Sequence, residues 1–161
     1  MKKNTGFTLI EVLIAMVILA FGLLGLAGLQ ASGLKQNQDA HFRSQATTLA
    51  YDFADRVRTN SSQRGTYVAN SAGNGTQTAS CLTTAGCTAT QMADHDISVW
   101  KSQITSTIPS GTGAMTQIAG AGTVCPPASG CNDDVFTITI SWDDDKDPTS
   151  AVASFSMSFN L

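Results

Sequence analysis

Positive charge is scarce in this chain. Of its 161 residues, nine are Lys or Arg and twelve are Asp or Glu, which gives a formal net charge of -3. Lys2 and Lys3 supply two of the nine basic residues, so only seven remain after them. Proteins bind the phosphates of nucleic acids through clustered Lys and Arg. The composition therefore argues against nucleic acid as a partner.

Catalytic motifs are also missing. The chain has two histidines, His41 and His95, and it contains neither a Gly-x-Ser-x-Gly nucleophile motif nor a phosphate-binding loop. The redox motif Cys-x-x-Cys is absent as well. We therefore expect no catalytic residue, no cofactor and no enzymatic activity, and we expect both histidines to lie at the surface.

Four cysteines form two pairs in the sequence, Cys81 with Cys87 and Cys125 with Cys131. Five residues separate the members of each pair, whereas structural zinc sites usually have pairs two to four residues apart. We therefore expect no metal. An even number of cysteines in an oxidising compartment indicates disulfide bonds, and three connectivities exist. We favour the two local bridges, because short loops close readily, and leave the connectivity open.

A long apolar run stands near the N-terminus. Every residue from 12 to 29 is apolar or Gly. Together with residues 7–10, the run is long enough to cross a bilayer core of roughly 30 Å as a helix. Lys2 and Lys3 are the only charges before it, and positive flanks stay in the cytoplasm, so the C-terminal body should lie outside. Glu11 lies inside the run, where a charge costs about 3 kcal/mol and requires a positive partner.

The helical pattern continues beyond the apolar run. Asp52 with Arg56, and Asp55 with Arg58, stand at the spacing of helical neighbours. Apolar residues recur there at intervals of three and four, which predicts one buried helix face: Phe42, Ala46, Leu49, Phe53 and Val57. We therefore expect one helix from Phe7 to about Asn60.

The rest of the chain predicts an α+β fold. Residues 60–80 are polar and Gly-rich, and we expect a connecting loop with a turn at residues 73–75. A second, shorter helix is expected at residues 92–108, capped by Asp94 or Asp96 and stopped by Pro109. Alternating patterns predict strands at the following places: residues 114–119, 123–125 (a weaker case), 135–142 and 154–161. We expect a small antiparallel sheet whose apolar face receives the long helix.

The N-terminus resembles the class III signal of type IV prepilins and pseudopilins. It has a basic leader ending in Gly6, then Phe7, then Thr-Leu-Ile-Glu ending in Glu11. The resemblance implies that a prepilin peptidase cuts between Gly6 and Phe7 and methylates the new amino group of Phe7. It also implies that Glu11 pairs with a Phe7 ammonium, either its own or that of a neighbouring subunit.

An ordinary signal peptide and a plain membrane anchor fit the N-terminus less well. A signal peptide would be cut after Ala31, but Leu29 stands where a small residue is needed. A plain anchor would leave both the Gly6–Phe7 junction and Glu11 as coincidences. The resemblance therefore gives the expected organisation: a leader at 1–6, a transmembrane and filament-core half-helix at 7–31, an amphipathic half-helix at 32–60, and a periplasmic globular pilin domain at 61–161.

Further blocks are similar to the V-type minor pilins, the type IV pilus modification proteins. The blocks are residues 22–30, 43–46, 49–60, 97–109 and 137–144. The resemblance implies a type IV pilin-like fold and a minor pilin that helps prime and assemble pili, and thus supports twitching motility and adhesion. Its expected partners are other minor and major pilins, the prepilin peptidase and the inner-membrane assembly machinery. Its expected location is the inner membrane with a periplasmic C-terminal domain, and then the pilus.

Rival functions remain at this point. The first 30 residues do not separate a pilin from a minor pseudopilin of a type II secretion system, and a pilus-tip adhesin and an anchored periplasmic enzyme are weaker alternatives. Three glycines, Gly22, Gly25 and Gly28, each cost a helix about 1 kcal/mol relative to Ala. In pilin-like filaments this stretch is thought to unwind, although the helix-breaking proline of many major pilins is absent here. Close helix packing through small residues accounts for the glycines equally well.

An acidic cluster at residues 143–147 is the one candidate for cation binding. Asp143, Asp145 and Asp147 alternate as in calcium loops. Pro148, however, stands where an EF-hand requires Gly, and Ser154 stands where it requires Glu. We therefore favour a solvated turn between two strands and keep calcium as the alternative.

Overall fold

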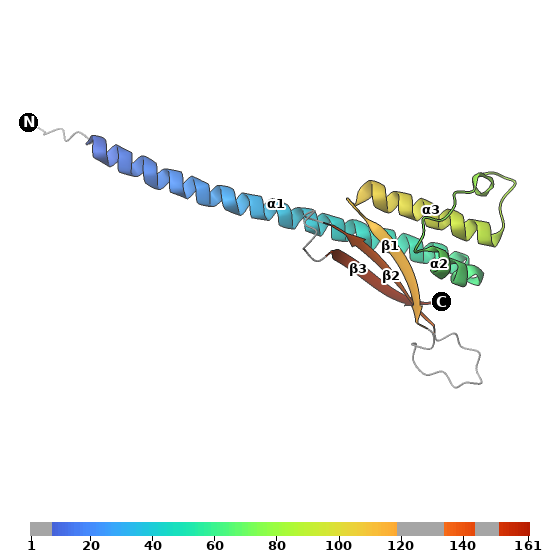
Figure 1. The fold of residues 1–161 in the computed structure, drawn as a ribbon. Coiled ribbons are helices and arrows are strands. Elements are labelled where there is room, and N and C mark those ends of the chain that lie inside the picture. The colour runs from blue at the N-terminus through green and yellow to red at the C-terminus, as the bar shows by residue number, and fades with distance from the viewer. Residues whose placement is uncertain (1–7, 119–133, 144–151) are drawn as a thin grey trace, which may run out of the picture. The chain divides into compact units, whose positions relative to one another are not determined.

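The structure is a computed structural model that describes residues 8–118, 134–143 and 152–161. Helices come first and strands follow (Figure 1). The elements are α1 (Leu9–Thr59), a 3₁₀ helix (Ser61–Gln63), α2 (Arg64–Asn70), a second 3₁₀ helix (Ala79–Leu82), α3 (Ala89–Thr107), β1 (Thr112–Ile118), β2 (Val135–Trp142) and β3 (Ala153–Asn160). The expected α+β class, with a long N-terminal helix and a small antiparallel sheet, is confirmed.

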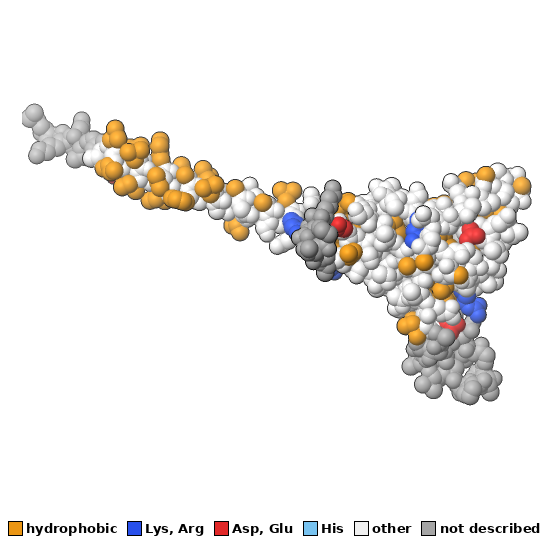
Figure 2. Space-filling model, in the orientation of Figure 1, with side chains coloured by type: hydrophobic (Ala, Val, Ile, Leu, Met, Phe, Trp, Pro, Cys, Tyr) orange, Lys and Arg blue, Asp and Glu red, His pale blue; other side chains and the backbone are white. Residues whose placement is uncertain are grey.

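The chain forms two compact units, and α1 runs through both. The first unit ends at Ala40 and the second begins at His41. In the first unit the large apolar side chains face outward: Leu9 is 79% exposed and Leu29 is 73% exposed. Figure 2 shows these side chains crowding the surface of the N-terminal part of the helix. The segment is long and apolar enough to cross a membrane, and none of its most apolar stretch is buried.

The C-terminal part of α1 supplies one side of the core in the second unit. Its fully buried residues recur at helical spacing: Ala46, Ala50, Phe53, Ala54 and Val57. Phe42 and Leu49 are half-buried and pack against the same cluster. The predicted apolar face is therefore confirmed.

The sheet has the order β1-β2-β3, and both pairs of strands are antiparallel. The pairing aligns Met115 with Ile138 and Ile138 with Met157. Along β2 every second residue is buried: Phe136, Ile138, Ile140 and Trp142. These side chains join those of α1 and α3 in one cluster. The predicted strand at 135–142 is confirmed, β3 begins at Ala153, one residue before the predicted start, and β1 begins two residues earlier than expected. The weaker strand at 123–125 lies outside the described residues.

The expectation of a loop at residues 60–80 is wrong for its first half and is confirmed for residues 71–78, which form turns and irregular structure. A 3₁₀ helix and α2 occupy its first half, and the Tyr67 side chain is fully buried. Tyr67 packs edge-on against Phe53, with ring centroids 5.7 Å apart. The burial of this one aromatic side chain thus holds α2 against the core, although the other residues of the segment do not predict a helix. The turn that follows needs Gly75, whose φ is +63° and where a Cβ would lie 2.5 Å from the Asp94 carbonyl oxygen.

The start of α3 also differs from the prediction. The helix begins at Ala89, three residues early, and its cap is Thr88 instead of Asp94 or Asp96. The Thr88 hydroxyl accepts a hydrogen bond from the Gln91 backbone N–H at 3.2 Å, and the Gln91 side chain accepts one from the Thr88 N–H at 3.0 Å. This capping box satisfies two backbone donors that would otherwise lack partners.

Candidate functional site

The residues predicted to act in processing lie at the start of the chain. Gly6 and Phe7 lie outside the described residues. Glu11 lies in the first turn of α1, where its backbone N–H donates to the Thr8 carbonyl at 3.1 Å. Its neighbours Ile10 and Val12 are 62% and 46% exposed. Glu11 is therefore a carboxylate on an otherwise apolar, uncovered helix surface, and no ion pair to it is formed within the part of the chain that the structure describes.

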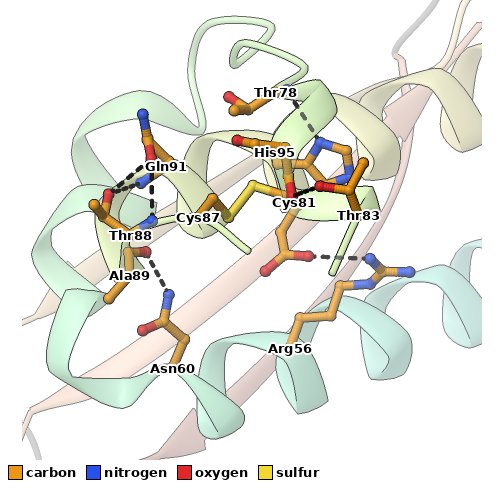
Figure 3. The surroundings of a disulfide bond; sticks show 12 residues. Arg56, Asn60, Thr78, Cys81, Thr83, Cys87, Thr88, Ala89, Gln91 and His95 are labelled. Carbon is orange, nitrogen blue, oxygen red and sulfur yellow. Dashed lines mark hydrogen bonds and ion pairs between the residues drawn. A yellow bond between two sulfur atoms is a disulfide. The ribbon is translucent and has the colours of Figure 1, made fainter. Parts of the chain in front are cut away.

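A disulfide bond joins Cys81 to Cys87, with 4.8 Å between their Cα atoms (Figure 3). It closes the segment just before the Thr88 cap of α3, and this segment includes Leu82, which is 71% exposed. The second pair, Cys125 and Cys131, lies outside the described residues. Within the described ranges, no group of three or more His, Cys, Asp or Glu side chains is arranged to hold a metal. Of the acidic cluster, only Asp143 is described.

His95 is buried, at 5% exposed, so the expectation that it lies at the surface is wrong. Its Nδ1 accepts a hydrogen bond from the Thr78 backbone N–H at 3.2 Å (Figure 3). His95 thereby attaches the segment before the disulfide to α3. His41 is exposed on α1, as predicted.

A polar network links α1, α2 and α3 beside the core. Arg56 donates to Asp52 at 2.9 Å, as the sequence predicts, and also to Asp96 at 3.1 Å, which it does not. The Tyr67 hydroxyl donates to the other oxygen of Asp96 at 2.6 Å. Asp96 is only 7% exposed, and these two donors compensate for its loss of water.

The contacts in this network raise the pKa values of two of its members, Tyr67 and Arg56. Burial raises the pKa of Tyr67, and the hydrogen bond to Asp96 raises it further. Burial lowers the pKa of Arg56, but its bonds to Asp52 and Asp96 outweigh this effect and raise the pKa overall. Elsewhere on α3, burial lowers the pKa of Lys101, whose ammonium donates to the Gly113 carbonyl and lies over the Trp100 ring.

Removing Asp96 should destabilise the second unit clearly. We expect Asp96→Ala to lower the free energy of unfolding by about 2–3 kcal/mol, because the buried Tyr67 hydroxyl loses the carboxylate that accepts its hydrogen bond and Arg56 keeps only one carboxylate partner. Asp52→Ala is the matched control, since it removes the exposed partner of the same Arg56 and should cost about 0.5 kcal/mol or less. Urea unfolding of the oxidised protein measures both. Equal losses for the two variants would contradict a specific role for Asp96.

Two family models match the chain, and they follow one another without a gap. The prokaryotic N-terminal methylation motif matches residues 1–27, and type IV pilin Tt1218 matches residues 28–98. It is a type IV pilin-like protein. The pilin match ends within α3, so it covers the half of the second unit that contains α2, the disulfide and the polar network. No curated protein and no solved structure matches the chain.

The matches agree with the geometry of this pilin-like chain. The methylation motif falls on the exposed apolar helix that contains Glu11, which fits membrane anchoring and assembly into a pilus. The motif implies processing by prepilin peptidase. Type IV pilins are structural subunits.

Proposed function

We propose that this chain is a V-type minor pilin, a subunit that helps prime and assemble type IV pili together with other minor and major pilins. The observation that carries the proposal is the methylation motif on an apolar helix with an uncovered surface. The V-type blocks at residues 22–30, 43–46 and 49–60 support the minor role, as does the position of Trp100 in α3.

The proposal assigns a role to each residue of the predicted site. Prepilin peptidase cuts after Gly6 and methylates Phe7, and Glu11 then pairs with a Phe7 ammonium in the assembled filament. The body lies in the periplasm before assembly and on the pilus afterwards. An oxidising compartment suits the Cys81–Cys87 bond, and Cys125 with Cys131 forms the second bridge.

Deletion and complementation test the function. We expect deletion of the gene to reduce surface pili and twitching, and the wild-type chain to restore both. Gly6→Val should remain at the mass of the precursor and fail to restore them, because a peptidase acting on so short a leader requires a small residue at the cut. Gly6→Ala, which keeps a small residue, should be cut and should restore pili at least in part.

The rival function has a different signature in the same experiment. A minor pseudopilin belongs to a secretion machine, so its deletion would spare pili and motility and block secretion of an exoprotein. That pattern would overturn the minor-pilin proposal. Cleavage of the Gly6→Val variant to a product that begins at Phe7 would remove Gly6 from the processing site.

A further inference from the structure

The two edge strands of the sheet, β1 and β3, differ in the contacts that their outer backbone groups make with the rest of the chain. On β1 the Met115 backbone N–H donates to the Ser71 hydroxyl at 2.9 Å, and the Met115 carbonyl accepts from that same hydroxyl at 3.1 Å. The Lys101 ammonium donates to the Gly113 carbonyl. Two side chains from outside the sheet thus occupy backbone groups along the β1 edge, which is how proteins prevent edge strands from pairing with other chains.

The same contacts reveal which groups of β3 are free. Since both Met115 groups point away from β2, Met115 and Ile138 are a non-hydrogen-bonded pair. Pairs alternate in an antiparallel ladder, so the Ile138 groups point toward β3 and bond Met157. The residues between these pairs in β3 therefore direct their N–H and C=O groups outward, away from the sheet: Ser154, Ser156, Ser158 and Asn160.

Within its own eight residues, β3 lacks the charged side chains and prolines that often protect an edge strand. Its eight residues contain no charge and no proline, and the four outward-directed residues are exposed. Figure 1 shows β3 at the margin of the sheet, and within the described residues no strand other than β2 pairs with it. A neutral edge of this length is a template for an added strand.

A second copy of this chain fits the β3 edge poorly. The β1 edge of the second copy is already occupied by its own Ser71 and Lys101. Antiparallel pairing of β3 with β3 requires a two-fold axis perpendicular to the sheet. This axis reverses the direction of residues 41–59 of α1 in one copy. The two copies would then continue from His41 in opposite directions, whereas both must enter the same membrane. Parallel pairing turns one copy over and places its half-buried Phe155 and Met157 beside the hydroxyl face of the other.

The geometry points to a different partner: we infer that the β3 edge of this chain binds an extended strand from another prepilin-type subunit. This inference rests on the proposed function, because such subunits share the membrane and the assembly pathway. The edge also specifies the chemistry of the added strand. Its residues alternate, with apolar side chains beside Phe155 and Met157 and small hydroxyl side chains beside Ser156 and Ser158, which already pair with Thr139 and Thr137 on β2.

Photo-crosslinking of the full chain in host membranes tests the inference. The probe is p-benzoylphenylalanine at position 158, and the crosslinked peptide is identified by mass spectrometry. The matched control places the same probe at Thr116, which lies on the same hydroxyl face but on the strand whose edge is occupied. We expect position 158 to give an adduct with an alternating segment of a different chain that has its own prepilin leader, and position 116 to give none.

Variants of Ser156 test whether backbone pairing makes the contact. Ser156→Pro removes an outward N–H and leaves the bonds to β2 in place, so the strand should stay in the sheet. The adduct should fall by about tenfold, since a factor of ten requires the loss of only one or two hydrogen bonds. Ser156→Ala keeps the N–H and should leave the yield within about twofold. Ser156→Lys keeps the N–H and adds a charge to the edge, and it should also lower the yield.

Each other outcome overturns the inference. The inference is wrong if position 158 gives no adduct, or gives one only within the same chain or with a second copy of it. It is also wrong if Ser156→Pro and Ser156→Lys both leave the adduct unchanged. Resistance to limited proteolysis equal to that of the wild type shows that the fold of each variant is intact. If wild-type protein restores pili and no edge adduct forms, the edge inference fails and the minor-pilin proposal stands. If the adduct forms and deletion spares pili, the edge inference stands and the minor-pilin proposal fails.

Discussion

Glu11→Val should leave the protein in the membrane and remove it from the pilus. The substitution takes a charge costing about 3 kcal/mol out of an apolar segment, so the anchor should hold at least as firmly as before. The same change removes the proposed partner of a Phe7 ammonium in the filament, which leaves that ammonium without a counter-charge. We expect incorporation into sheared pili to fall by at least about tenfold, since loss of a buried charge pair exceeds about 1.4 kcal/mol.

Glu11→Gln is the control for this effect. It keeps the length and the hydrogen-bonding groups of the side chain and removes only the charge, so it should also impair incorporation if pairing is the reason. Membrane fractionation and immunodetection in sheared pili measure anchoring and assembly separately. Normal incorporation of the valine variant would eliminate the pairing role, and loss of the protein from the membrane would mean that Glu11 serves insertion instead.

Trp100→Ala should cause the largest loss of stability in the second unit. Trp100 is fully buried and stacks on Phe53, with ring centroids 4.0 Å apart, and its Nε1–H donates to the Leu49 carbonyl at 3.0 Å. Truncation creates a cavity beside α1 and the sheet, so we expect a loss of about 3–5 kcal/mol in the free energy of unfolding. That is a large share of the roughly 5–15 kcal/mol typical of a domain.

Two controls make the Trp100 result specific. Trp100→Phe keeps an aromatic ring against Phe53 and loses the indole N–H, so it should cost less than the alanine variant. Tyr51→Ala, which removes an aromatic side chain that is 54% exposed, should change stability by about 0.5 kcal/mol or less. Urea unfolding followed through the buried Trp142 reports on all three variants. A loss below about 1 kcal/mol for Trp100→Ala would contradict a core position.

Elements with a strong period were predictable from the sequence. The alternation from Val135 to Trp142 and the stripe from Phe42 to Val57 each specify one buried face, and the structure has both. Charge pairs within α1 were equally readable, because Asp52 and Arg56 are helical neighbours. In each case the signal is local, and tertiary contacts reinforce it.

Features that depend on a single long-range contact could not be predicted. Tyr67 turns a polar stretch into a packed helix because it reaches Phe53 and also Asp96, which lies 29 residues further along the chain. The place of Asp96 near the start of the expected helix suggests a cap, yet its partners are Arg56 and Tyr67. The start of α3 is a different case, because Thr88 followed three residues later by a Gln is a capping-box signal that the sequence does contain.

The continuity of α1 has a mechanical consequence. Tension on the N-terminal end of α1 is transmitted along one unbroken helix to the second unit. It is resisted by the packing of residues 46–57 and by the hydrogen bond from the Trp100 indole to the Leu49 carbonyl. The side chains of Phe53 and Trp100, stacked nearly parallel, would be loaded in shear. Gly22, Gly25 and Gly28 lie within the apolar part of α1, and each lowers helix stability by about 1 kcal/mol relative to Ala. We therefore expect tension along α1 to unwind the turns around these glycines before it detaches residues 46–57 from the core.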